Sequence, residues 1–172
     1  MVAYATIIGY ISIMHEGEAE TMRRVVHAFI RRFGLLDQAQ TPCGMQLPLS
    51  RAHALMALLH SPSITQNELA EKLALSKSNI SRLVARLVAA GRVKRRKDGD
   101  DGRAYRLELT AKGRRLAVAI DGQSLARFSA IISVLPARRR GAIIDALAFL
   151  VDATPPAARK LLSHLPAARG PR

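Results

Sequence analysis

Residues 65–91 read TQNELAEKLALSKSNISRLVARLVAAG, and this stretch predicts two short helices joined by a tight turn. Thr65 and Glu68 have the spacing of a capping box, in which each side chain satisfies a free amide at the helix start. Ser76 is placed to cap the second helix and Gly91 to end it. This is a helix-turn-helix, whose second helix fits the major groove of DNA. Its candidate DNA contacts are Ser76, Lys77, Ser78, Asn79, Ser81, Arg82 and Arg86.

Residues 92–109 predict a basic β-hairpin directly after the second helix. Turn residues fill positions 98–102, and the return strand alternates apolar and polar side chains. A helix-turn-helix with such a hairpin is a winged helix; an ordinary surface hairpin is the alternative, which the basic side chains around the tip disfavour. A wing can place an Arg in the minor groove, and Asp101 is spaced to hold Arg103 through a bidentate pair. The candidate DNA contacts of the hairpin are Lys94, Arg95, Arg96, Lys97 and Arg103.

The charge of the chain is concentrated in the same region. The 172 residues carry a formal net charge of +14, and residues 77–115 alone hold thirteen Lys or Arg against four Asp or Glu. Such a field attracts polyanions, although a solvated basic face would give the same count. The apolar half of the composition excludes global disorder. The single cysteine, Cys43, excludes an internal disulfide and a Cys-based zinc site, and it favours a reducing, cytoplasmic location.

Amphipathic segments flank the winged core on both sides. Residues 18–33, residues 111–134 and a segment after Pro136 repeat apolar side chains at helical spacing, and Ser50 is placed to cap a further helix that ends near His60. The core is too small to cover these stripes, so a two-fold dimer is predicted to bury them, with an intrachain helical bundle as the alternative. Residues 1–17 are interpreted as an N-terminal extension, a strand or helix rather than a signal peptide. Residues 153–172 form an Ala/Pro/Arg-rich tail.

On these residues the chain resembles the MarR family of bacterial regulators. The matching motifs are QNELA at 66–70, LSKSNISR at 75–82, AGRV at 90–93, the D-G-R of the wing tip at 101–103, and LELTAKG at 107–113. The resemblance covers about residues 18–152, with a DNA-binding core at about 50–113 and dimerisation helices at 18–37 and 111–152. The fold class it implies is mainly α with a small β-hairpin wing: a winged helix-turn-helix core plus N- and C-terminal dimerisation helices. It also implies that the helix after Ser76 reads the major groove while Arg103, oriented by Asp101, enters the minor groove.

The resemblance implies a homodimeric, sequence-specific transcription regulator that acts on promoter DNA. A repressor released by a small aromatic or anionic effector is the simplest form, because a dimer on a promoter blocks polymerase. Arg24, His27, Arg31 and His53 are candidate effector-pocket residues, with solvated surface side chains as the alternative.

The same residues are compatible with other functions. A non-specific or architectural DNA-binding protein is the main alternative, while the basic excess disfavours a winged-helix interaction module that has lost DNA binding. The sequence has no nucleophile elbow, phosphate-cradling glycine loop or helical carboxylate pair, so we expect neither an enzyme nor a cofactor. The five histidines lack the partners of a metal site, and Cys43 is expected to be an ordinary thiol.

Overall fold

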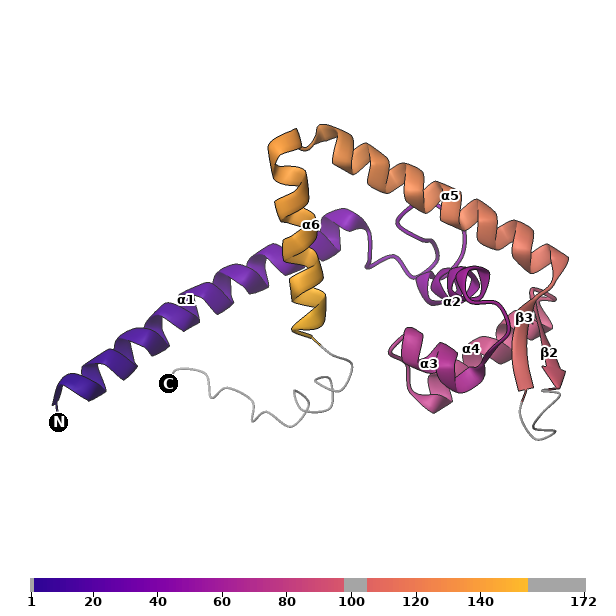
Figure 1. The fold of residues 1–172 in the computed structure, drawn as a ribbon, viewed down its shortest axis with the longest axis horizontal. Helices are drawn as coiled ribbons and strands as arrows, with labels where there is room; N and C mark the ends of the chain where they lie inside the picture. The colour runs from indigo at the N-terminus through magenta and orange to yellow at the C-terminus, as the bar shows by residue number, and fades with distance from the viewer. Residues whose placement is uncertain (1, 98–104, 155–172) are drawn as a thin grey trace.

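The computed structural model describes residues 2–97 and 105–154, with side chains from residue 17 onward (Figure 1). The predicted fold class is confirmed in its architecture: the chain is mostly helical, with a small antiparallel sheet of three strands. The elements in chain order are α1 (Val2–Phe33), α2 (Leu49–His60), β1 (Ile64–Thr65), α3 (Gln66–Lys72), α4 (Lys77–Ala89), β2 (Val93–Lys97), β3 (Tyr105–Leu109), α5 (Ala111–Val134) and α6 (Ala137–Asp152).

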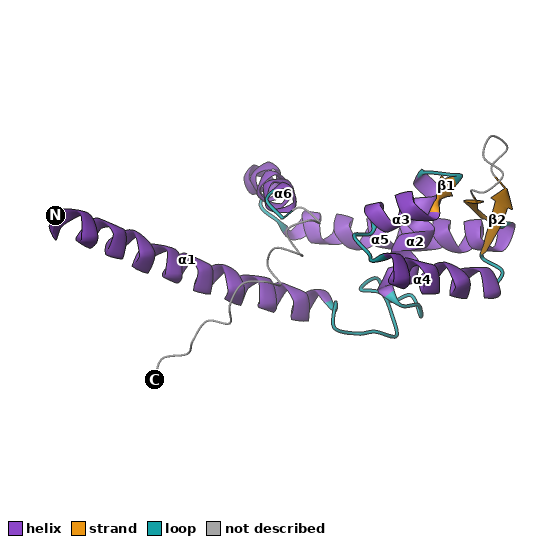
Figure 2. Ribbon diagram, turned by 90° about the horizontal axis from the view of Figure 1, so that it is seen from below, coloured by secondary structure: helices purple, strands orange, loops and turns teal. Residues whose placement is uncertain are grey.

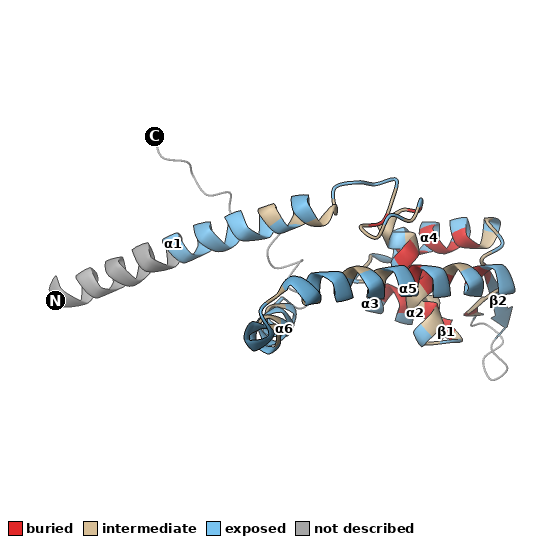
Figure 3. Ribbon diagram, turned by 90° about the horizontal axis from the view of Figure 1, so that it is seen from above, coloured by how far each residue is buried: buried red, intermediate tan, exposed pale blue. Residues whose placement is uncertain are grey.

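The hydrophobic core lies in the winged part of the chain. Helices α2, α3 and α4 pack with the sheet and with the first half of α5, and Figure 3 shows the buried residues gathered there. The inward-facing apolar residues of α4 are buried, apart from the half-buried Val88. The largest fully buried side chains are Leu55, Leu58, Leu69, Ile80, Val84, Leu87, Leu107 and Ile120.

The predicted caps of α3 and α4 are confirmed. The backbone N–H of Thr65 donates to the Glu68 carboxylate at 2.6 Å, and the Glu68 N–H donates to Thr65 Oγ1 at 3.2 Å. Ser76 Oγ accepts from the Asn79 N–H at 3.3 Å. The hydrogen bonds from Thr65 hold the pKa of Glu68 below its ordinary value of 4.5. Both helices of the helix-turn-helix therefore begin where the sequence predicts.

The cap predicted for α2 is wrong. The helix begins at Leu49, so Ser50 lies inside its first turn, and no side chain makes a cap hydrogen bond. Pro48 occupies the N-cap with a φ of −55°. Because its ring fixes φ near that value and it has no N–H to satisfy, proline starts the helix without a hydroxyl cap.

The sheet of the wing contains one short strand, β1, that the sequence did not predict. β2 and β3 pair antiparallel, and the two residues of β1 add to the other side of β3, with Ile64 opposite Leu107. The guanidinium of Arg106 donates to the backbone O of Ser63 at 2.9 Å, next to β1. A strand of two residues has too few positions to show an alternating pattern, so the sequence did not reveal it.

Helix α5 starts against the base of the wing. Thr110 caps it by accepting from the Gly113 N–H at 3.0 Å, and the Thr110 backbone N–H donates to the backbone O of Arg92 at 3.0 Å. A Cβ at position 113 would lie 1.8 Å from the same Arg92 oxygen. Only glycine permits this approach, which gives the Leu-Thr-x-x-Gly motif a physical reason.

Helices α1 and α6 extend away from the winged core (Figures 1 and 2). No described side chain of α1 and no residue of α6 is buried. The alternative of an intrachain helical bundle is therefore wrong, because the chain leaves these apolar stripes uncovered. From Val2 onward the predicted extension forms one helix with the segment predicted at 18–33, since α1 is continuous from Val2 to Phe33.

Some predictions concern residues outside the described ranges. These are the wing tip with Asp101 and Arg103, and most of the tail predicted at 153–172. Among the described helices, none combines the length and apolar character that crossing a bilayer requires.

Candidate nucleic-acid interface and adjoining pocket

The outer face of α4 is polar, basic and open to solvent. All seven residues predicted as contacts, Ser76 and its helix neighbours Lys77, Ser78, Asn79, Ser81, Arg82 and Arg86, are exposed. The first turn of α4 carries no acidic side chain, so the positive end of the helix dipole is uncompensated. Such a surface offers both hydrogen-bond donors and positive charge to a polyanion.

Two side chains of this face are linked to each other. Arg82 Nη2 donates to Asn79 Oδ1 at 2.7 Å, across one turn of the helix. Among the described residues no carboxylate forms an ion pair with Arg82. The bond therefore orients the guanidinium and the amide together while leaving the positive charge unneutralised.

The wing continues the basic surface. Lys94, Arg95, Arg96 and Lys97 of β2 are all exposed, as predicted. Glu108 of β3 pairs with two of them: Lys94 Nζ lies 3.1 Å from its carboxylate and Arg96 Nη1 lies 3.4 Å from it. The hydrogen bond from Lys94, with the charge of both cations, holds the pKa of Glu108 below its ordinary value.

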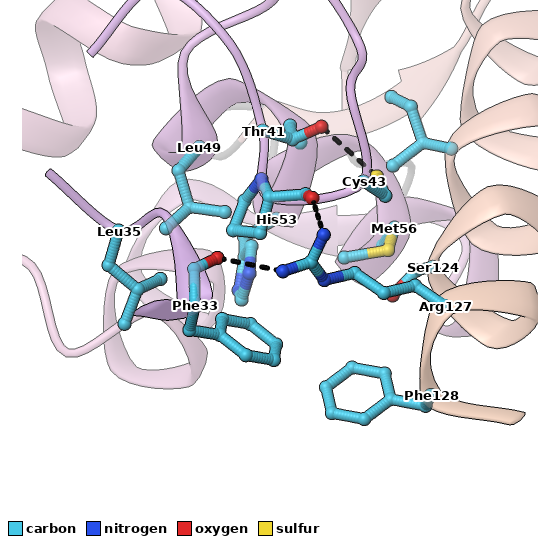
Figure 4. Close-up of a pocket in the computed structure, with 13 residues that line it drawn as sticks. Phe33, Leu35, Thr41, Cys43, Leu49, His53, Met56, Ser124, Arg127 and Phe128 are labelled. Atoms are coloured by element: carbon cyan, nitrogen blue, oxygen red, sulfur yellow. Dashed lines mark hydrogen bonds between the residues drawn. The ribbon is translucent and has the colours of Figure 1, made fainter. Parts of the chain in front are cut away.

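A pocket of about 370 Å³ lies between the end of α1, helix α2 and the middle of α5 (Figure 4). Its walls are mainly apolar and include two aromatic rings, Phe33 and Phe128, with centroids 5.6 Å apart. The remaining lining residues are Leu35, Thr41, Pro42, Cys43, Leu49, Ala52, His53, Met56, Ile120, Ser124 and Arg127. The pocket thus joins the winged core to helices that extend from it.

Arg127 is the cation of this pocket. Its guanidinium donates to the backbone O of Phe33 at 3.1 Å and to the backbone O of Pro42, and it lies 4.8 Å from the centre of the Phe33 ring. Its Nε is buried with no hydrogen-bond partner, and no described carboxylate forms an ion pair with it. A partly buried cation without a counter-anion is costly, so the pocket is suited to a ligand that supplies one.

The predicted effector residues divide between two places. His53 lines the pocket, and partial burial holds the pKa of its imidazole below the ordinary value of 6.5, which favours the neutral ring at pH 7. Arg24, His27 and Arg31 are exposed on α1 and do not line the pocket. Arg127 is not among the predicted pocket residues, although the sequence holds a signal for it: it is the only basic residue between Leu116 and Leu135.

Cys43 also lines this pocket, half-buried, with its Sγ 3.0 Å from Thr41 Oγ1. Elsewhere, His60 Nε2 lies 2.9 Å from Asp121, which links α2 to α5. Within the described ranges no group of three His, Cys, Asp or Glu side chains is arranged to hold a metal ion.

Comparison with known proteins supports the resemblance found in the sequence. Residues 45–104 match the family model of the MarR family, and this segment holds α2, the helix-turn-helix and the start of the wing. None of the curated proteins matches the chain.

Solved structures match most of the chain. The PcaV transcriptional regulator from Streptomyces coelicolor, in complex with its natural ligand, is 23% identical over 78% of this chain and 92% of its own, with a TM-score of 0.59. NadR in complex with 4-hydroxyphenylacetate is 25% identical over 76% of this chain and 89% of its own, with a TM-score of 0.56. The MepR–DNA complex from S. aureus is 18% identical over 79% of this chain and 96% of its own, with a TM-score of 0.59. The chain therefore has the fold of these regulators.

Proposed function

We propose, from the MarR-family match of its winged core, that this protein is a sequence-specific DNA-binding transcription regulator that acts as a homodimer. One observation carries the proposal: the exposed face of α4 and the adjoining β2 strand form a continuous basic surface on a chain of net charge +14. The MepR structure of the same fold contains DNA, which agrees with this use of the fold. A protein of this function works on the chromosome, so we infer a cytoplasmic, nucleoid-associated location.

Helix α4 is the proposed reader of the DNA sequence. The major groove is about 12 Å wide and admits a helix, and there Asn side chains suit adenine while Arg side chains suit guanine. Asn79 and Arg82 are held together at 2.7 Å, so they would approach neighbouring base pairs as one unit. Ser78 and Ser81 lie exposed beside them and suit base edges or phosphates. We further propose that Arg103, oriented by Asp101, enters the minor groove.

A second copy of the chain is the proposed cover for the extended helices. Among the exposed large apolar residues, Leu147 of α6 is 54% exposed and Phe149 is 76% exposed, and α1 exposes Val25 and Phe29. A monomer rarely leaves so large an apolar surface in water. A two-fold dimer built on residues 18–37 and 111–152 would bury it and would set two α4 helices about one DNA turn apart.

The pocket around Arg127 is the proposed effector site. Its aromatic walls suit a flat ring, and the unpartnered Nε of Arg127 suits a carboxylate. The ligand class is therefore an aromatic carboxylate, the class to which the 4-hydroxyphenylacetate bound to NadR belongs. Because the pocket is shared by α2 of the core and by α1 and α5, a ligand would shift α4 relative to the dimer helices and weaken DNA binding. This is the behaviour of a repressor.

Fluorescence anisotropy on the DNA upstream of the protein's own gene tests DNA recognition. At physiological salt, we expect the specific fragment to bind at least ~10³-fold more tightly than random competitor DNA. A ratio near one would instead identify a non-specific or architectural DNA-binding protein.

The same titration tests the effector site. We expect 4-hydroxyphenylacetate to weaken DNA binding and the neutral 4-hydroxyphenylacetamide to have little effect, because only the acid pairs with Arg127. Arg127→Gln should abolish the difference between the two compounds while the circular dichroism spectrum stays unchanged. An equal response to acid and amide would refute the carboxylate assignment.

A further inference from the structure

The two faces of the wing differ in whether their basic side chains pair with a carboxylate. Paired residues on antiparallel strands share a face, so the register places Arg95 with Leu107 on one face and Lys97 with Tyr105 beside them. Leu107 is buried, which identifies this as the face that turns toward the core. The intervening residues of β2 lie on the opposite face.

On the opposite face, one carboxylate of the protein offsets part of the charge of two cations. Glu108 lies between Lys94 and Arg96, with its carboxylate oxygens 3.1 Å and 3.4 Å from their nitrogens. The Glu108 side chain is only 20% exposed, so the carboxylate stays between the two cations. These two basic residues carry less free charge toward DNA than their exposure suggests.

Arg95 has no such partner. Among the described residues it forms no ion pair and no hydrogen bond, and it lines a concavity of about 450 Å³ between the wing, α3 and α4. The polar residues that share this concavity are Thr65, Gln66, Asn67, Ser81 and Tyr105. They bring amide and hydroxyl groups from β1, α3, α4 and β3, and no carboxylate lines the site.

We propose that this concavity binds one backbone phosphate of the DNA, with Arg95 as its charged ligand. The inference rests on the proposed function and extends it to a specific contact. Ser81 belongs both to the exposed face of α4 and to the concavity, so a strand that borders the groove read by α4 would pass over Arg95. A phosphate held there would fix the register of α4 on the duplex without reading sequence.

The test compares Arg95→Gln with Arg96→Gln, the same change one residue along on the opposite face. We expect Arg95→Gln to weaken binding by about tenfold on specific and random DNA alike. It should also lower the slope of log K against log salt by about 0.9, the value for one phosphate. Arg96→Gln should weaken binding and lower the salt slope clearly less than Arg95→Gln, because Glu108 already offsets part of that charge.

A second variant tests the concavity without removing a charge. Tyr105→Phe removes one hydroxyl from the concavity and should weaken binding by a few-fold with an unchanged salt slope, because no charge is lost. Equal losses for the two Arg variants, with wild-type protein still binding, would overturn the phosphate site but leave the proposed function intact. Absence of DNA binding by the wild-type protein would overturn both.

Discussion

Gly113→Ala is the substitution whose effect follows most directly from the geometry. A methyl group at this position would lie 1.8 Å from the backbone O of Arg92 and 2.8 Å from its carbon. Real Cβ contacts stay above 3.0 Å, so the start of α5 or the base of the wing has to move by more than an ångström. The obstacle is backbone, which no side-chain rotation relieves.

The expected change in the free energy of unfolding combines three effects. Overpacking against a fixed neighbour costs about 1–3 kcal/mol. Displacing the Arg92 oxygen also weakens its 3.0 Å hydrogen bond from the Thr110 N–H, which is worth about 1 kcal/mol. The higher helix propensity of alanine offsets at most about 1 kcal/mol of this loss. The net loss is about 2 kcal/mol, or about 4–8 °C in Tm for a chain of this size.

Thermal unfolding followed by circular dichroism, at one fixed protein concentration, measures the effect. Gly122→Ala is the matched control, because it lies in the same helix and a Cβ there meets nothing within 4 Å. We expect the control to raise Tm by a few degrees through the helix propensity term alone. If both variants shifted Tm in the same direction, the close approach of α5 to the wing would be refuted.

Four further outcomes follow from the caps, the apolar helices and the wing. Glu68→Gln should flatten the loss of stability below about pH 4.5 in urea titrations, because a lowered pKa stabilises the fold above the ordinary value and this contribution disappears as pH falls; an unchanged acid limb would contradict it. Leu147→Glu should give a folded monomer in sedimentation, and a persistent dimer would place the interface elsewhere. Arg82→Ala should reduce discrimination among DNA sites by ~1–3 kcal/mol, whereas a uniform loss would mean that it contacts only phosphate. Arg103→Ala should weaken binding mainly at A·T-rich flanks, and unchanged footprints there would contradict the wing assignment.

The winged core was predictable because its signals are local. Thr65 and Ser76 each cap a helix by accepting from an N–H three residues later, and Gly91 follows the C-cap of α4, so residues close in sequence determine each boundary. The return strand of the wing alternates apolar and polar side chains, and the turn before it is rich in Gly and Asp. Where a different residue starts the helix, as with Pro48 in place of Ser50, the observed boundary lies two residues from the predicted one.

The pocket was not predictable in the same way. Arg127 binds the backbone oxygens of Phe33 and Pro42, which lie 94 and 85 residues earlier in the chain. No periodicity within one helix encodes such a contact, so three of the four residues predicted for the pocket lie outside it, exposed on α1. Glu108 pairs with Lys94 and Arg96 but not with Arg95, and this choice likewise depends on strand register rather than on composition.

Hydroxyl-radical footprinting of the purified protein on its upstream DNA tests the central claim most directly. Two copies of α4 on one duplex predict two protected half-sites, with centres about 10 base pairs or a multiple of that apart and lying on one face of the helix. A single protected patch, or no protection even in dilute buffer, would contradict the claim that α4 and its wing bind DNA two copies at a time.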